Sequence, residues 1–180
     1  MATTSMRTPF WSEVSSSRLV VALVAGFVAT HIATVFGYWF HGFNLPDLGW
    51  PNFNGILLLG LDASPLSQFW AGTAYHMATG ICFGLFFAFI VHPRLRIKNS
   101  MGGNILKGII FGLVLATLSA IWLVPQLFNT VFNADLGWFS QNVGPTLGST
   151  AWKGIFGIYL WHIIWGLNLG LIYNPLPAEE

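Results

Sequence analysis

Two histidines, His76 and His162, are the residues of this chain whose type and surroundings could support chemistry. Each follows an aromatic residue and precedes glycines at the fourth and eighth positions, in the segments YHMATGICFGL and WHIIWGLNLGL. This spacing places each histidine and its glycines on one face of a helix. Two such histidines could ligate a b-type haem, because the absent glycine side chains would leave room for the flat ring.

A third histidine, His31, is expected at the same depth in a membrane. At about 1.5 Å per residue, all three histidines lie roughly 10–14 Å from the same end of their apolar segments. Ionisable residues are costly to insert in lipid, so three at one level indicate a shared role. With His31 as a third ligand, copper or zinc is an alternative to haem because imidazole suits both metals.

The glycines also have a simpler interpretation as helix-packing residues. Small side chains at every fourth position let helix backbones approach closely, which favours helix association in lipid. The histidines would then form hydrogen bonds across the bundle, and this is the commoner meaning of such a pattern. The packing positions are Gly80, Gly84, Gly166 and Gly170.

The composition indicates that these residues are carried by helices in a bilayer. The chain is 54 % hydrophobic and 7 % charged, whereas about a quarter of the residues of a soluble domain are charged. Four apolar segments approach the roughly 20 residues that cross the hydrocarbon core: residues 19–40, 69–91, 105–124 and 154–173. The sequence therefore predicts an all-α integral membrane protein with four transmembrane helices, as a single domain over residues 1–180. We expect Pro125 to end the third helix.

The basic residues predict how the spans are oriented. All of the Lys and Arg residues except Lys153 fall on one side of a four-span protein. The positive-inside rule then places both termini, including the segment 1–17, in the cytoplasm. The expected location is a bacterial-type inner membrane, with the lipid bilayer as the main contact. A net charge of +1 argues against nucleic acid as a partner, since phosphate neutralisation needs clustered cations.

The tetrapeptide DLGW occurs twice, and each copy is followed by an asparagine at the eighth position, Asn54 or Asn142. The copies and the two histidine–glycine segments recur in the same order at nearly the same separation. This indicates a duplicated helical hairpin, with one repeat over about 19–91 and the other over about 105–173. Like-oriented hairpins would be related by a pseudo-two-fold axis along the membrane normal.

Each DLGW copy is expected in an outer loop, where it would brace a turn. Glycine permits unusual backbone angles, aspartate accepts local N–H bonds, and tryptophan suits the headgroup level. The apolar stretch GILLLGL, at residues 55–61, is too short to span and is expected to lie in the interface. The turn residues are Asp47, Gly49, Trp50, Asp135, Gly137 and Trp138.

At the paired His-x3-Gly-x3-Gly helices, the chain resembles small bacterial four-helix membrane proteins of unknown function. The resemblance covers the spans but neither GILLLGL nor the N-terminal segment MATTSMRTPFWSEVSSS. It implies the fold and an inner-membrane location, and it carries no activity.

The sequence favours a non-catalytic role, because it has no nucleotide-binding glycine loop, HExxH or CxxC motif, or Ser–His–Asp set. We therefore expect an integral subunit that docks in a larger membrane complex, such as a respiratory or other redox assembly, or that associates with itself. One alternative is a haem-b or metal-binding membrane protein that uses His76 and His162, with His31 assisting. Another is a small oligomeric transporter or channel.

Overall fold

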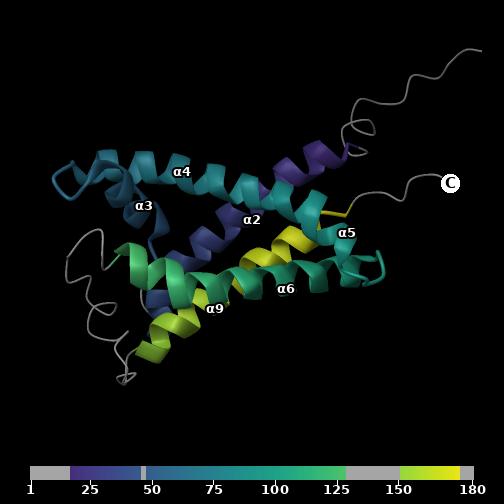
Figure 1. Cartoon of the computed structure of the whole chain (residues 1–180). Coiled ribbons are helices and arrows are strands. Elements are labelled where there is room, and N and C mark those ends of the chain that lie inside the picture. The colour runs from purple at the N-terminus through teal and green to yellow at the C-terminus, as the bar shows by residue number, and fades with distance from the viewer. Residues whose placement is uncertain (1–16, 46–47, 129–150, 175–180) are drawn as a thin grey trace, which may run out of the picture.

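The computed structural model describes residues 17–45, 48–128 and 151–174, which form helices and connecting turns without a strand (Figure 1). Four stretches are long and apolar enough to cross a membrane: Arg18–Phe43, Pro65–Arg94, Met101–Val124 and Lys153–Ile172. The predicted all-α class and the four membrane-spanning helices are confirmed. The chain is thus a multi-pass membrane protein.

Each span is built from one long helix, in two cases extended by a π-helical segment. The helices are α2 (Arg18–Trp39), α4 (Pro65–Phe86), α6 (Met101–Leu118) and α9 (Ala151–Ile172). Shorter elements are η1 (Phe40–Phe43), α3 (Trp50–Leu59), η2 (Phe87–Val91), α5 (His92–Arg94) and η3 (Ser119–Phe128).

The π-helical segments η2 and η3 are explained by two prolines. Pro93 is the second residue after η2, and Pro125 lies within η3. A proline donates no backbone hydrogen bond, and its ring clashes with the carbonyl of the preceding turn, so the helix must widen or kink there. The expectation that Pro125 ends the third helix is wrong, because the helix continues in the wider π form through Phe128.

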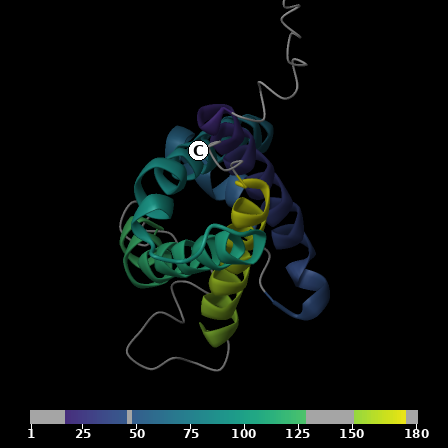
Figure 2. The ribbon, with the colours of Figure 1, turned by 90° about the vertical axis from the view of Figure 1, so that its right-hand side faces the viewer.

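The long helices form two hairpins, α2 with α4 and α6 with α9, and the hairpins meet where α2 packs against α9. The first and last described residues lie at one end of the bundle together with α5, while α3 lies at the other end (Figure 1). An end view shows α2 and α9 side by side, with α4 and α6 flanking them (Figure 2). Helices α4 and α6 do not pack closely along their backbones.

Aromatic side chains fill part of the space between α4 and α6. The ring of Phe111 on α6 lies 5.9 Å from that of Phe86 and 5.8 Å from that of Phe87. Phe83, one turn earlier on α4, lies 6.4 Å away in an edge-on arrangement. This cluster closes the half of the space nearer to α5, and the half nearer to α3 remains open.

Glycines set the close approach of the helices within each hairpin, as the packing interpretation predicts. A Cβ atom at Gly84 would lie 2.6 Å from the Cα atom of Gly26 on α2. In the second hairpin, a Cβ atom at Gly166 would collide with the carbonyl oxygen of Gly108, and one at Gly170 with that of Asn104. Any larger side chain at these positions must therefore push the helices apart.

The two hairpins are similar in composition but differ in register. Gly26 meets α4 between Gly80 and Gly84, whereas Gly112, its counterpart in the proposed repeat, meets α9 near His162 and Gly166. This corresponds to about one helical turn of sliding. The α2–α9 packing also lacks an equally close counterpart between α4 and α6. The duplicated hairpin and its pseudo-two-fold axis therefore stay predictions.

The first DLGW copy starts helix α3 in place of a simple exposed turn. Gly49 is the N-cap residue, and Trp50 is only 9 % exposed because it packs against Trp161 of α9, with ring centroids 6.3 Å apart. Trp50 therefore lies inside the bundle, and its expected position at the headgroup level stays a prediction. Asp47 and the second copy, Asp135, Gly137 and Trp138, lie outside the described residues.

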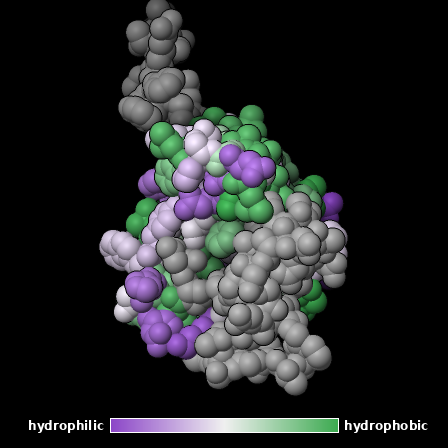
Figure 3. Space-filling view, turned by 90° about the vertical axis from the view of Figure 1, so that its left-hand side faces the viewer, coloured by the Kyte–Doolittle hydropathy of each residue, from purple (hydrophilic) through white to green (hydrophobic). Residues whose placement is uncertain are grey.

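The apolar stretch GILLLGL forms the second half of α3 and does not span. Helix α3 lies against α4, where Gly55 and Gly72 let the two backbones touch. Gly60 ends the helix with a φ of +82°, a conformation that favours glycine. Seen from the end of the bundle that carries α3, the described surface has hydrophilic and hydrophobic residues mixed (Figure 3).

Candidate functional site

His76 lies at the centre of a hydrogen-bonded chain that joins three helices. Its Nε2 atom is 2.9 Å from Thr34 Oγ1 on α2, and its Nδ1 atom is 3.2 Å from Asn54 Nδ2 on α3. The Thr34 hydroxyl already donates to the carbonyl oxygen of Thr30, at 2.7 Å. Thr34 must therefore accept from His76 Nε2–H, while Nδ1 accepts from the Asn54 amide. His76 is thus assigned as the uncharged Nε2–H tautomer.

The same chain of contacts reaches α9 through Trp165. The indole Nε1–H of Trp165 donates to Thr30 Oγ1 at 2.9 Å, and the Thr30 hydroxyl donates to the carbonyl oxygen of Gly26 at 2.8 Å. Gly80 provides the space for Thr30, because a Cβ atom at Gly80 would collide with the Thr30 side chain. The hairpins are therefore connected by a buried polar contact as well as by apolar packing.

His162 has a different arrangement from that of His76. Its Nδ1 atom is 2.8 Å from the carbonyl oxygen of Ile158, one turn earlier on α9, so Nδ1 carries the proton. In an uncharged imidazole, Nε2 is then an acceptor. Its partner is Ser119 Oγ at 3.5 Å, a long contact compared with the usual 2.7–3.2 Å. His162 therefore has an acceptor atom that is only weakly satisfied.

A cavity of about 330 Å³ contains both histidines in its wall. It lies between α4 and the α6–η3 helix, with α3 and α9 behind it, in the half of the bundle that Phe111 does not close. Apolar and aromatic side chains dominate its wall. The lining residues are Thr30, Trp50, Asn54, Leu57, Tyr75, His76, Thr79, Gly80, Phe83, Leu115, Leu118, Ser119, Trp122, Leu123, Trp161, His162 and Trp165.

The exposure of the lining residues locates the mouth of the cavity. Tyr75 on α4 is 44 % exposed and Trp122 on η3 is 64 % exposed, whereas His76 and His162 are each 8 % exposed. The mouth therefore lies between α4 and η3 on the lateral surface of the bundle, and the histidines lie deep inside. In a membrane this lateral surface faces lipid.

Two indole N–H groups of the cavity wall have no hydrogen-bond partner among the described residues. They belong to Trp50 and Trp161, whose side chains are 9 % and 6 % exposed. Buried donors are normally satisfied by protein, water or ligand, because an unpaired polar group is costly in an apolar environment. Both indole nitrogens are fully enclosed, and that of Trp161 faces Gly37 of α2, where an added Cβ atom would lie 3.4 Å from it. The polar atom that the wall offers to a bound molecule is therefore the weakly satisfied nitrogen of His162.

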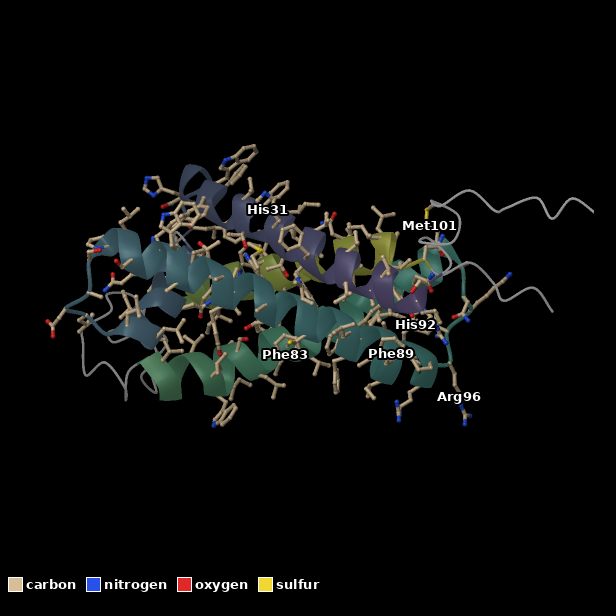
Figure 4. The ribbon with its side chains drawn as sticks, turned by 90° about the horizontal axis from the view of Figure 1, so that it is seen from above. His31, Phe83, Phe89, His92, Arg96 and Met101 are labelled. Atoms are coloured by element: carbon tan, nitrogen blue, oxygen red, sulfur yellow. The ribbon has the colours of Figure 1, made fainter. Side chains whose placement is uncertain are left out.

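The structure brings His76 and His162 to one cavity but does not bring His31 to it. His31 is exposed on α2, where its ring stacks with that of Phe27 at 6.4 Å. Figure 4 shows His31 on the opposite side of the bundle from Phe83, which lines the cavity. Within the described part of the chain, no group of three or more His, Cys, Asp or Glu side chains could hold a metal ion.

A second polar cluster, not anticipated from the sequence, lies at the opposite end of the bundle. Asn104 of α6 connects His92 Nε2, at 2.9 Å, to Asn174 Oδ1, at 3.0 Å. His92 is buried against Tyr173, with ring centroids 5.1 Å apart. Lys107 is also buried, and its Nζ atom donates to Asn99 Oδ1 at 2.6 Å. Figure 4 shows His92 at this end with Arg96 and Met101.

The fold and the cavity define a class, namely an all-helical multi-pass membrane protein with a laterally open cavity among its spans. Comparisons with protein families, with curated proteins and with solved structures give no match.

Proposed function

We propose that this protein binds a lipid-soluble organic molecule in the cavity between α4 and the α6–η3 helix. The observation that carries the proposal is the position of His76 and His162, from different hairpins, in the wall of one largely apolar cavity. Small-molecule sites typically combine an apolar lining with a few placed polar groups. The mouth faces the lateral surface, so the molecule would enter from the lipid.

Extraction of the purified protein tests this proposal. The protein is purified in mild detergent, and the organic extract is compared by mass spectrometry between the wild type and two variants. Leu115→Trp fills the cavity, whereas Val114→Trp adds the same side chain at an exposed neighbour on α6. We expect a compound at near-stoichiometric amount in the wild type and in Val114→Trp, and its loss in Leu115→Trp. Equal extracts from all three proteins would contradict the proposal.

A bound haem is less compatible with the same geometry. Both ring nitrogens of His76 already form hydrogen bonds, and Nδ1 of His162 is bonded to Ile158. Ligation through His76 would require its separation from Thr34 or Asn54. A haem-b or metal site at His76 and His162 stays a prediction, and a visible absorption spectrum of the purified protein tests it.

Docking in a larger membrane complex is the second candidate function. The aromatic side chains Tyr75 and Trp122 flank the mouth and are exposed, and such residues are enriched at protein interfaces. A partner's membrane helix at this position would cover the bound molecule. We expect the same partner chain in repeated mild-detergent purifications, and a solitary, ligand-bound monomer would contradict this role.

We also infer that the two hairpins arose by duplication. The inference is supported by the histidines, since each reaches a hydroxyl group on the preceding span: His76 reaches Thr34, and His162 reaches Ser119. We further infer an inner-membrane location with both termini in the cytoplasm. Its support is the grouping of Arg94, the 95–100 loop and the two described chain ends at one end of the bundle.

A further inference from the structure

We propose that the bound molecule is a lipid that carries a hydroxyl group on an aromatic ring, as in a phenol or a hydroquinone. Its hydroxyl group binds between His162 Nε2 and Ser119 Oγ, and its apolar tail leaves through the mouth of the cavity. This inference rests on the proposed function, and it adds the chemical class of the ligand.

The hydrogen-bonding capacity of His162 favours a hydroxyl group on the ligand. Its Nδ1–H is used by the carbonyl oxygen of Ile158, so the remaining nitrogen is an acceptor. The Ser119 hydroxyl approaches this nitrogen only to 3.5 Å. A ligand hydroxyl can donate to His162 and accept from Ser119 at the same time, whereas an ether or a ketone cannot donate.

The His76 side of the cavity does not compete for this hydroxyl group. His76 donates to Thr34 and accepts from Asn54, so both of its ring nitrogens are satisfied within the protein. No Lys or Arg belongs to the described cavity wall, which argues against a carboxylate or phosphate headgroup. An uncharged headgroup with a donor is the best match.

The aromatic wall explains the preference for a ring. Phe83, Trp122, Trp161 and Trp165 all line the cavity, and aromatic rings pair favourably in stacked or edge-on geometry. The exposed positions of Tyr75 and Trp122 leave a path for an alkyl tail into lipid.

Three probes of equal tail length test the inference on the whole protein in detergent. They are 4-decylphenol, its methyl ether 4-decylanisole, and decylbenzene, and native mass spectrometry measures the fraction bound. We expect the phenol to bind about tenfold more tightly than the ether, because the ether leaves the acceptor of His162 unpaired. His162→Leu should abolish this preference and Ser119→Ala should weaken it. The control Asn168→Ala, on α9 but outside the cavity wall, should retain it.

The outcomes separate this inference from the proposed function. Equal binding of all three probes to the wild type would overturn the hydroxyl inference and leave an apolar binding cavity. Binding of no probe would overturn both. A phenol preference that persists in His162→Leu would also overturn the assignment to His162. The wild-type comparison is independent of whether any variant folds.

Discussion

The imidazole ring of His76 on α4 lies 5.6 Å from the indole ring of Trp161 on α9, measured between centroids. Trp161 in turn lies 5.0 Å from His162 and 6.3 Å from Trp50. One indole ring therefore contacts both of the histidines that the sequence singles out and also the tryptophan of the first DLGW copy. The contacts of Trp161 with His76 and Trp50 join the two hairpins at the back of the cavity.

Replacement of His76 by leucine should destabilise the bundle. The substitution removes the contacts to Thr34 and Asn54, and hydrogen bonds between membrane helices contribute on average about 0.6 kcal/mol each. We expect a loss of about 1 kcal/mol, seen as a lower melting temperature in detergent. His31→Leu is the matched control. Because His31 is exposed, this variant should have the same melting temperature as the wild type. Equal melting of both variants would show that the network contributes no stability.

An alanine at Gly84 should separate the helices of the first hairpin. Its Cβ atom would lie 2.6 Å from Gly26 Cα, so the backbones must move, and overpacking typically costs about 1–3 kcal/mol. Gly102→Ala on α6 is the control, since nothing lies within 4 Å of the added atom. We expect a lower melting temperature for Gly84→Ala alone. Comparable melting of the two variants would mean that the glycine contact does not hold α2 against α4.

Asn104→Leu should loosen the end of the bundle that carries α5. Asn104 joins His92 to Asn174, and leucine can form neither bond. We expect a loss of about 1 kcal/mol and faster amide exchange in α5 and in the last turn of α9, measured by mass spectrometry. Asn168→Leu removes only a bond to the carbonyl of Ile164 within α9 and serves as the control. Unchanged exchange in Asn104→Leu would contradict a structural role for the cluster.

Cysteine labelling tests the orientation of the spans. In a Cys82→Ser background, Lys98→Cys and Asp62→Cys introduce thiols in the loops at opposite ends of the bundle. A membrane-impermeant maleimide applied to intact cells should label position 62 and spare position 98, because the positive-inside rule retains basic loops in the cytoplasm. Permeabilised cells should show labelling at both positions. Labelling of position 98 in intact cells would reverse the orientation.

The four helices are predictable from the sequence because their signal is simple. Apolar length alone identifies a membrane span, and the observed stretches match the expected ones to within a few residues. The glycine pattern also predicts the close contacts, since a glycine lets the backbone of a neighbouring helix approach closely in any helix pair. Details of register depend on every contact between two helices, and no local pattern in the chain encodes the one-turn shift between the hairpins.

The candidate site is predictable only in part. His76 and His162 are recognisable because ionisable residues are rare within spans. Asn54, the partner of His76, carries a sequence signal as the eighth position of the motif that begins at Asp47, but its partner depends on how α3 folds back onto α4. Ser119 carries no such signal. A threonine within a span, such as Thr34, could orient a histidine ring, but this signal is weak because hydroxyl residues in helices commonly bond to their own backbone. His31 is expected at the same depth as the other two histidines, but it lies on the exposed face of α2 and does not line the cavity.

Nitrogen-15 NMR of histidine-labelled protein in nanodiscs reports the tautomers of His76 and His162 and the contact of His162 with a ligand hydroxyl. The resonances of His76 and His162 are assigned from the spectra of single His→Leu variants. We expect an Nε2–H tautomer for His76 and an Nδ1–H tautomer for His162. We also expect the His162 Nε2 resonance to shift on addition of 4-decylphenol but not of 4-decylanisole. An Nε2–H tautomer for His162, or a His162 resonance that does not shift on addition of 4-decylphenol, would contradict the proposed site.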